Sequence, residues 1–215
     1  MRIALLLALI GAPLAAQTPA VAPPASTTTA PAPLPPPGPG ITRVTLRMAE
    51  GPIVLDLEAA KAPLSTANFL KYVDAKRFDG ASIYRIVKSA PGFGFIQGGI
   101  NNDPKKYFPP VAHEPTSKTG LHHTDGTISL PRLAPGSARG EFFITVGDVL
   151  SMDADPSLPG DNLGFAAFGH VVQGMDLIRA MLDLPTSPTK GVGVMKGQML
   201  DKPLAITTAR RVPAK

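Results

Sequence analysis

Two short stretches of this sequence match elements that support acyl transfer in serine enzymes. Lys118-Thr119-Gly120 matches the K-T-G element of penicillin-binding enzymes, and Ser187-Pro188-Thr189-Lys190 matches their S-x-x-K element. The two stretches stand in the wrong chain order, and no S-x-N element lies between them. Chance therefore explains both matches better than acyl-transfer chemistry does.

The histidines raise the question of a metal site. The chain has four of them, namely His113, His122, His123 and His170. Adjacent histidines on an extended chain point to opposite faces, so we expect His122 and His123 to lie in a solvated loop rather than to share a metal ion. The absence of cysteine excludes disulfides, a thiolate zinc site and a cysteine nucleophile. We therefore expect neither a metal nor another cofactor.

The composition is that of a globular protein with a mild basic excess. Hydrophobic residues make up 44% of the 215 residues, charged residues make up 17%, and the formal net charge is +5. This length is compatible with one or two domains. Because the basic residues form no long runs, nucleic acid is not an expected partner. We expect a monomer.

The first 16 residues have the pattern of a secretory signal peptide. Arg2 precedes an unbroken apolar run at 3–10, and Leu14-Ala15-Ala16 offers a cleavage site before Gln17. The run is shorter than the roughly 20 residues that span a bilayer. We therefore expect export without a stable membrane span, to the periplasm if the source is Gram-negative. An uncleaved interfacial anchor is the alternative.

Residues 17–40 have the composition of a linker. They include nine prolines and no charged residue, so they cannot bury enough apolar surface to offset the entropy of ordering. Pro-rich chains of this kind are extended and semi-rigid. The expected folded domain is therefore 41–215. A ligand for a PxxP reader at Pro35-Pro36-Pro37 is the alternative reading of the linker.

The rest of the chain is rich in predicted strands. Alternating apolar and polar residues predict strands at 42–48 and 52–58, joined into a hairpin at Glu50-Gly51. Further short strands are predicted at 82–87, 95–98, 127–130, 142–146, 165–172 and 204–211. This pattern favours a closed, mainly antiparallel barrel that carries a few helices.

Two helices are predicted between these strands. Pro63 opens the first, in which apolar residues recur at spacings of three up to Val73. The second covers 175–182 and begins after Gly174. The stretch at 99–126 is long for a loop in a compact domain, so we expect it to have a functional role.

Six segments resemble, in order, the motifs of cyclophilin-type peptidyl-prolyl isomerases. They are Ala62-Pro63 with Asn68-Phe69 and Tyr72, and the segments 83–87, 95–99, 126–130, 141–144 and 165–172. Each motif is weak alone, but six in order across about 42–212 are specific. The resemblance implies a closed eight-stranded antiparallel barrel with two flanking helices, which agrees with the strand pattern.

The resemblance also implies an activity, cis–trans exchange of Xaa–Pro bonds, with Arg85 as the catalytic residue. Rotation about a peptide bond is opposed by amide resonance, and no bond is broken, so no nucleophile, metal or proton shuttle is needed. An always-charged guanidinium that donates to the prolyl nitrogen weakens the double-bond character. On the strand pattern alone, Arg85 would be an ordinary solvated arginine.

Further groove residues follow from the resemblance. Gln97 orients the arginine or binds the peptide backbone. Phe143 forms the floor of an apolar pocket for the proline ring, whereas Phe142 alternates into the core. Leu130 lines the same pocket or packs in the core. Phe165 stands where many members of the family have His or Tyr, and keeps the apolar wall.

The spacing between the arginine and the glutamine departs from the family pattern. Arg85 and Gln97 are twelve residues apart, which is longer than is usual in the family. The extra residues shift the expected pocket phenylalanine, so either Phe93 or Phe95 fills that role.

Other departures concern the groove walls. Glu141 stands where the family has Gln, and its carboxylate could pair with Arg85 as an anchor or as a competitor of the substrate. Pro131-Arg132 stands where Ala-Asn is common, and Pro131 has no N–H to donate. Leu163 could supply part of the apolar surface of a tryptophan that some members carry.

The sequence thus predicts an exported prolyl isomerase that assists the folding of other exported proteins by binding their Xaa–Pro segments. The long spacing, Glu141 and Pro131 motivate a second hypothesis, a catalytically weak chaperone or scaffold module on the same barrel. A third hypothesis is an envelope adaptor in which the linker at 17–40 recruits partners.

Overall fold

The computed structural model describes residues 34–157 and 159–213. The predicted signal peptide and residues 17–33 of the predicted linker lie outside the described residues, and the boundary between linker and domain stays a prediction. The strands are β1 (Ile41–Met48), β2 (Pro52–Glu58), β3 (Ala81–Ala90), β4 (Phe93–Gly99), β5 (Thr127–Leu130), β6 (Glu141–Val146), β7 (Ala166–Gln173), β8 (Thr186–Ser187) and β9 (Met199–Arg211).

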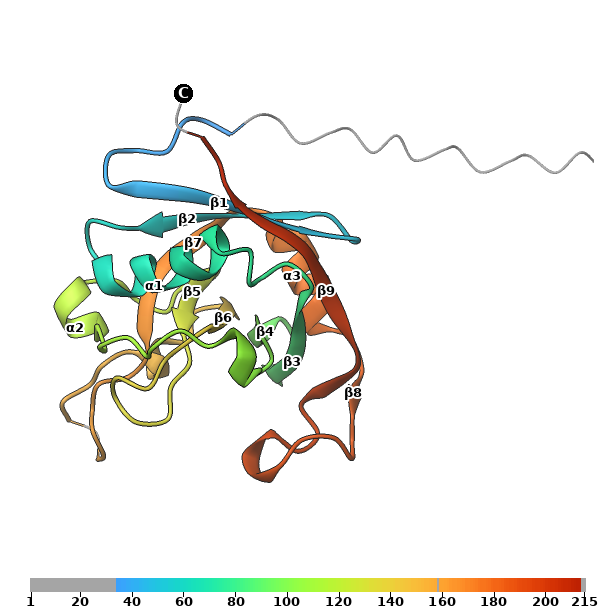
Figure 1. Cartoon of the computed structure of the whole chain (residues 1–215). Helices are drawn as coiled ribbons and strands as arrows, with labels where there is room; N and C mark the ends of the chain where they lie inside the picture. Colours follow the sequence, from blue (N-terminus) through green and yellow to red (C-terminus); the bar gives the residue numbers. More distant parts are fainter. Residues whose placement is uncertain (1–33, 158, 214–215) are drawn as a thin grey trace, which may run out of the picture. The chain divides into compact units, whose positions relative to one another are not determined.

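Eight of these strands close into a barrel (Figure 1). Their order is β1-β2-β7-β5-β6-β4-β3-β9, and β9 pairs with β1 to complete the ring. The short β8 pairs with β9 outside this ring. The pairings are antiparallel throughout. The prediction of a closed eight-stranded antiparallel barrel is therefore confirmed.

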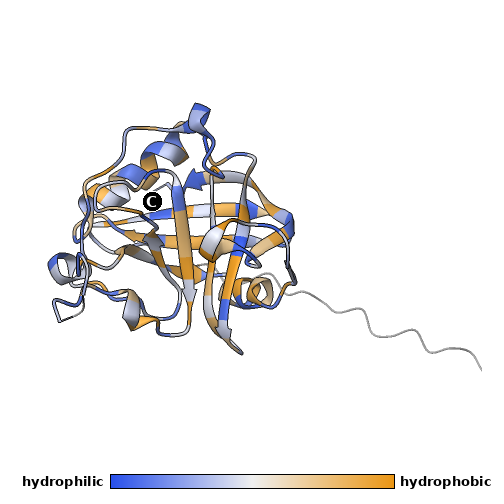
Figure 2. Cartoon of the chain, turned by 90° about the horizontal axis from the view of Figure 1, so that it is seen from below, coloured by the Kyte–Doolittle hydropathy of each residue, from blue (hydrophilic) through white to orange (hydrophobic). Residues whose placement is uncertain are grey.

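The first hairpin shows how the alternating sequence builds the barrel wall. Val44 and Leu46 are fully buried and lie opposite Leu55 and Ile53 in the β1–β2 ladder. Figure 2 shows apolar and polar residues alternating along the strands. Successive side chains of a strand point to opposite faces, so this alternation gives each strand one face toward the core.

The last strand begins earlier than predicted and carries a bulge. Its ladder with β3 passes from the Ile83–Leu204 pair directly to the Arg85–Met199 pair. Pro203 falls in the skipped stretch, where its missing N–H breaks no ladder hydrogen bond. Gln198, directly before β9, consequently lies beside β3, and its carbonyl accepts a hydrogen bond from the N–H of Ile86 at 2.8 Å.

The described residues form three α-helices rather than the two predicted. They are α1 (Pro63–Asp74), α2 (Thr116–Thr119) and α3 (Met175–Leu182), together with the 3-10 helices η1 (Pro104–Lys106), η2 (Leu150–Met152) and η3 (Gly193–Met195). The helices expected at α1 and α3 are confirmed. The missed helix, α2, starts after Pro115 and ends at Gly120 with φ 69°. A single turn is too short to show helical periodicity.

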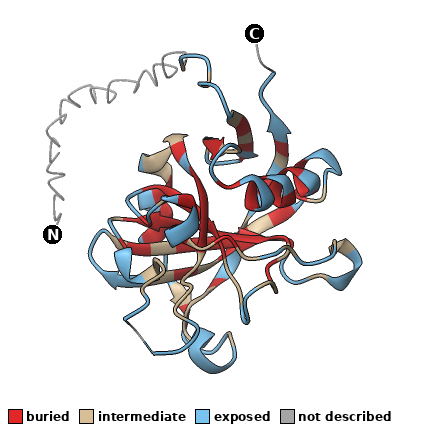
Figure 3. Ribbon diagram, turned by 90° about the vertical axis from the view of Figure 1, so that its left-hand side faces the viewer, coloured by how far each residue is buried: buried red, intermediate tan, exposed pale blue. Residues whose placement is uncertain are grey.

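The core fills the inside of the barrel, where Figure 3 shows the buried residues gathered. Four phenylalanines form its aromatic centre, with Phe69 at ring-centroid distances of 4.9 Å from Phe78, 5.7 Å from Phe142 and 5.5 Å from Phe168. All four are essentially inaccessible to solvent. Phe142 thus occupies the core, as predicted. Within the described part of the chain, no helix is both long and apolar enough to cross a membrane.

Candidate active site

A groove of about 850 Å³ opens on the outside of the barrel wall formed by β3, β4 and β6. Its base includes Arg85 of β3, Phe95 and Gln97 of β4, and Phe143 of β6. The volume lies in the range of small-molecule and peptide side-chain sites. Strands thus supply the base of the groove, and loops supply its rims.

Three phenylalanines line the groove together. The Phe143 ring lies 5.3 Å from Phe95 and 5.5 Å from Phe165, measured between centroids, with an edge-on angle of 86° to Phe165. Phe143 and its neighbour Phe142 face opposite sides of β6, because side chains alternate along a strand. The three rings create an apolar surface suited to a proline ring.

The guanidinium of Arg85 lies at the edge of these rings, 5.4 Å from the Phe95 centroid. Its Nη1 donates to Oε1 of Gln97 at 2.7 Å. Its Nε and Nη2 both donate to Oε1 of Gln198, at 2.9 and 2.6 Å. A guanidinium has five N–H donors, so two of them have no acceptor among the described residues. Burial lowers the pKa of Arg85, but an arginine keeps its charge at neutral pH.

A chain of hydrogen bonds continues from Gln97 away from the arginine. Its Nε2 donates to the hydroxyl of Tyr84 at 3.0 Å, and that hydroxyl donates to Oε2 of Glu141 at 2.7 Å. The other carboxylate oxygen of Glu141 accepts from the N–H of Asn102 at 2.8 Å. Burial raises the pKa of Glu141, against the opposing effect of these two hydrogen bonds. Burial also raises the pKa of Tyr84.

The expected pair between Glu141 and Arg85 does not form. The carboxylate of Glu141 accepts hydrogen bonds from Tyr84 and Asn102. The guanidinium of Arg85 donates instead to two glutamines. Glu141 lines the groove as predicted, but it acts on the arginine only through the chain of bonds from Tyr84 to Gln97. It therefore neither anchors Arg85 directly nor blocks its two remaining donors.

Arg132 holds the rim beside Phe165. Its guanidinium forms a two-pronged ion pair with Asp161, at 2.7 Å for both bonds, and Nε donates to the carbonyl of Gly164 at 2.7 Å. Its charge lies 5.8 Å from the centroid of the Phe165 ring. The ion pair holds the pKa of Asp161 at about 2. The loop after β5 is thus tied to the loop before β7.

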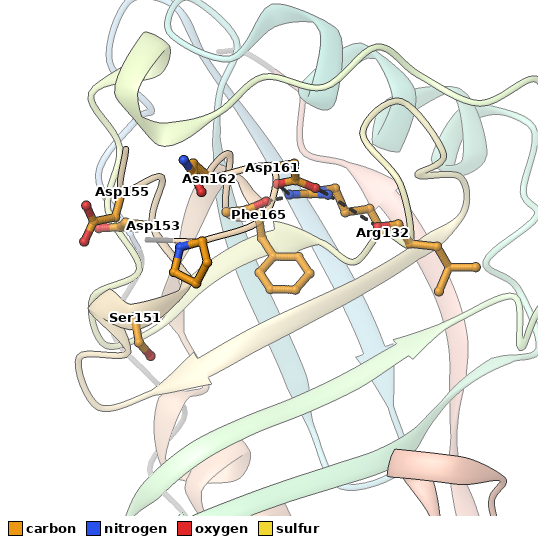
Figure 4. A pocket seen from close by; sticks show the side chains of 10 residues that line it. Arg132, Ser151, Asp153, Asp155, Asp161, Asn162 and Phe165 are labelled. Atoms are coloured by element: carbon orange, nitrogen blue, oxygen red, sulfur yellow. Dashed lines mark hydrogen bonds and ion pairs between the residues drawn. The ribbon is translucent and has the colours of Figure 1, made fainter. Parts of the chain in front are cut away.

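A smaller pocket of about 260 Å³ adjoins the groove (Figure 4). It shares Arg132, Leu133 and Phe165 with the groove, and Asp153 and Asp155 also line it. Its carboxylates are engaged within the protein, by Arg132, by the two adjacent histidines and by a serine. Figure 4 shows Arg132 and Asp161 joined beside the ring of Phe165, a residue that lines both this pocket and the groove.

His123 lies directly beneath the floor of the groove, and the expectation of a solvated histidine pair is wrong for it. Its ring is fully buried and stacks on Phe143, with centroids 5.7 Å apart and an interplanar angle of 11°. Nδ1 lies 2.6 Å from Oδ1 of Asp153, and Nε2 lies 2.9 Å from Oγ of Ser129. Burial lowers the pKa of His123, although Asp153 opposes this effect. His122, its neighbour, is exposed.

Most of the predicted groove residues come together, since Arg85, Phe95, Gln97, Pro131, Arg132, Glu141, Phe143 and Phe165 all line the groove. Phe93 does not, because its ring lies over Gly147, where a Cβ would come within 2.7 Å of it. Leu130 is buried in the barrel core instead. Leu163 is also absent from the lining, and its N–H donates to Asp161.

Several lining residues were not predicted. Met152 of η2 lines the groove, and so do Val194 and Met195 of η3. Gln198, which holds Arg85, was also missed. The bulge in β9 places it there, and no local sequence pattern marks that bulge except Pro203.

No group of three or more His, Asp or Glu side chains that could hold a metal ion occurs within residues 34–157 and 159–213. The base of the groove carries the Arg85 guanidinium, which donates to the side-chain carbonyls of Gln97 and Gln198. This arrangement suits the binding and distortion of a neutral amide.

Comparison with known proteins places these features in a family. The family described as cyclophilin type peptidyl-prolyl cis-trans isomerase/CLD matches residues 43–203. A Dickeya dadantii protein named peptidyl-prolyl cis-trans isomerase A is 34% identical over 172 residues, which cover 79% of this chain and 84% of the relative. An Acinetobacter baylyi peptidyl-prolyl cis-trans isomerase is 34% identical over 150 residues, covering 68% and 74%.

The comparison with solved structures agrees with the sequence comparisons. A crystal structure of a Cryptosporidium parvum cyclophilin type peptidyl-prolyl cis-trans isomerase matches with a TM-score of 0.61 at 17% identity, covering 81% of this chain and 99% of the other. The barrel, the ordered motifs and the bacterial relatives agree. This chain belongs to the cyclophilin-type peptidyl-prolyl cis-trans isomerase family, and its activity is the cis–trans isomerisation of Xaa–Pro peptide bonds.

Proposed function

We propose that this chain is an exported prolyl isomerase that assists the folding of other exported proteins, with Arg85 as its catalytic residue. One observation carries the assignment of Arg85. Its guanidinium is fixed by the carbonyls of Gln97 and Gln198 and keeps two N–H donors beside three phenylalanine rings. A fixed donor next to an apolar surface is what a prolyl substrate requires.

The proposed step is a rotation in which no bond is broken. Amide resonance sets a barrier of about 18–20 kcal/mol to this rotation. A free N–H of Arg85 donates to the prolyl nitrogen, which localises the lone pair there and weakens the C–N double bond. Because the guanidinium is half-buried, the hydrogen bond forms in a less polar environment than water and is correspondingly stronger.

The hydrogen bond from Arg85 supplies only part of the barrier lowering that fast isomerisation requires. Uncatalysed exchange takes about 10–100 s, so turnover at about 10³ s⁻¹ lowers the barrier by roughly 7 kcal/mol. A hydrogen bond to a charged group contributes about 1.5–3 kcal/mol. The remainder comes from the groove, which binds the twisted amide better than either planar form. Phe95, Phe143 and Phe165 hold the proline ring during the twist.

The isomerase assignment is tested by NMR exchange spectroscopy on a short Xaa–Pro peptide with the purified full chain. Arg85→Ala is measured beside it at equal folded concentration, and Arg85→Lys tests whether a charge without the planar fork suffices. We expect fast exchange that falls by about tenfold to 150-fold in Arg85→Ala, as the loss of a charged hydrogen bond of about 1.5–3 kcal/mol predicts. Unchanged exchange in Arg85→Ala would overturn the role of this residue.

A second candidate function is a binding module with little turnover. Pro131 favours it, because this rim position of the groove has no N–H for the peptide backbone. In the same experiment, a folded chain that binds the peptide without accelerating exchange would support the binding module and exclude the isomerase for such substrates.

The proposal of export rests on the first 16 residues, in which an apolar run follows Arg2 and small residues precede Gln17. It is tested by expressing the full chain in a Gram-negative host and weighing the protein in the periplasmic fraction by mass spectrometry. A periplasmic product that starts at Gln17 is expected. Full-length chain retained in the cytoplasm would rule the export out.

A further inference from the structure

Three large apolar side chains of the described residues are almost fully exposed to solvent. Leu133 is 94% exposed, Val194 is 87% exposed and Val192 is 83% exposed. Leu133 and Val194 line the groove, together with the less exposed Met195. Single exposed apolar residues need no explanation, but these lie on two separate loops that meet the same groove.

The loop that carries Val192 and Val194 has a well-defined backbone conformation. Figure 1 shows it projecting beyond β8 and β9. Gly191, Gly193 and Gly197 adopt φ angles of 94°, 58° and 83°, in the region that favours glycine. The N–H of Gly197 donates to the carbonyl of Lys190 at 3.0 Å and closes the loop. The loop therefore presents its apolar tips in a defined place.

The same loop is joined to the catalytic arginine. The N–H of Gln198 donates to the carbonyl of Met195 at 3.1 Å, and the side chain of Gln198 holds Arg85. The carbonyl of Gln198 is bonded to the N–H of Ile86 in β3. Val194 and Met195 are therefore placed at the part of the groove that adjoins Arg85.

Other parts of the lining are different in character. Polar and charged side chains there come from the stretch after β4, from the loop before β6 and from the first residue of β6, namely Asn102, Ser137, Arg139 and Glu141. A peptide that passes along the groove thus meets Val194 and Met195 beside the arginine, and elsewhere these polar groups mixed with Tyr107, Pro110 and Pro135. Beside the arginine, Val194 and Met195 offer an apolar surface to an apolar side chain next to the proline.

We infer that Val194 and Met195 form an apolar subsite that selects Xaa–Pro segments with a bulky apolar residue next to the Xaa–Pro pair. This inference rests on the proposed function and names its substrate class. Such segments are buried in folded proteins and exposed in unfolded ones. The subsite would direct the enzyme to unfolded chains rather than to polar loops on folded surfaces.

The test uses two Xaa–Pro peptides that differ only in the neighbouring residue, leucine or serine, each placed in turn before and after the pair. Peptide dissociation constants are measured by NMR titration with the full chain, and exchange rates in the same samples. Partial burial of one leucine predicts about threefold to tenfold tighter binding of the leucine peptide on one side of the pair. Val194→Ser should remove this preference.

Val192→Ser is the matched control, since it is the same change at an equally exposed valine two residues away that does not line the groove. It should keep the preference. Equal binding of both peptides, or an equal loss in Val192→Ser and Val194→Ser, would overturn the subsite. Absence of accelerated exchange would instead contradict the isomerase proposal, because the dissociation constants do not depend on turnover.

Discussion

Phe142 and Phe143 are neighbours in β6 but belong to two different aromatic clusters. Phe142 faces the barrel interior, with its ring 5.7 Å from Phe69. Phe143 faces the groove, 5.3 Å from Phe95 and 5.5 Å from Phe165. The ring spacings are alike, so contact distance does not distinguish a core from a binding surface.

The difference lies in what surrounds the rings. The interior cluster is enclosed by other apolar side chains, whereas the groove cluster ends at two guanidiniums, with Arg85 near Phe95 and Arg132 near Phe165. Among residues 34–157 and 159–213, no further layer packs over the groove phenylalanines, and the proposed function puts the proline ring of the substrate on that side. Alternation along β6 places one phenylalanine in each cluster. The two arginines at its edge distinguish the groove cluster, the candidate site, from the core.

Phe142→Ala has the largest expected effect and acts on stability. Truncation of a fully buried phenylalanine leaves a cavity and costs about 3–5 kcal/mol, a large part of the stability of a domain this size. Urea denaturation followed by circular dichroism measures the change in the free energy of unfolding. A loss below that of Phe143→Ala would contradict the division into core and site.

Phe143→Ala is the matched change on the other face of the strand. It removes the floor that would hold the proline ring, and a lost contact of about 1.5–3 kcal/mol lowers catalytic efficiency by about tenfold to 100-fold. The stability loss should be smaller than in Phe142→Ala, because one side of the ring already faces the groove. Exchange rates and denaturation midpoints of both variants separate the two effects. Equal stability losses with unchanged exchange would refute the comparison.

The fold was predictable because its signals are local. Alternation places Val44 and Leu46 inside the barrel, and Pro63 marks the start of α1. The features that the sequence did not predict are either very short or depend on pairing between distant parts of the chain. The single turn of α2 shows no periodicity, and the β9 bulge depends on pairing with β3, which the sequence near Pro203 does not display.

The site was predictable to the same extent. Arg85 and Gln97 pair directly across the β3–β4 ladder, so motifs on two adjacent strands place them together. Gln198 reaches the arginine from 113 residues away. The prediction of a solvated histidine pair was wrong for His123, which is fully buried. Alternation along an extended chain puts adjacent side chains on opposite faces, but it does not say which face is buried.

Gln198→Ala tests the distant support of the groove cluster. The change removes two of the three hydrogen bonds that hold Arg85, so the guanidinium loses its fixed direction while the aromatic floor stays intact. We expect kcat to fall by about tenfold with KM nearly unchanged, as the loss of a positioning bond predicts. Gln198→Glu keeps the acceptor oxygen and should restore most of the rate. A rise in KM alone would assign Gln198 to binding instead.

The smallest expected effect concerns the layer between the two clusters, where His123 stacks beneath Phe143. Burial lowers the pKa of His123, so the folded state favours the neutral ring. The stability from this preference is fully present above the ordinary pKa of about 6.5 and is lost as the pH falls below that value. Acid should therefore weaken the groove floor before it weakens the barrel core.

His123→Asn removes the titrating ring, and His122→Asn is the matched control at the exposed neighbour. Unfolding midpoints at pH 7.5 and pH 5.5 should differ less in His123→Asn than in the wild type or in His122→Asn. The Glu141 carboxyl, whose pKa burial raises, acts in the opposite direction because its protonated form is favoured in the folded state, and it is common to all three proteins. An identical pH response in His123→Asn and the wild type would show that the layer beneath Phe143 does not couple proton binding to the groove.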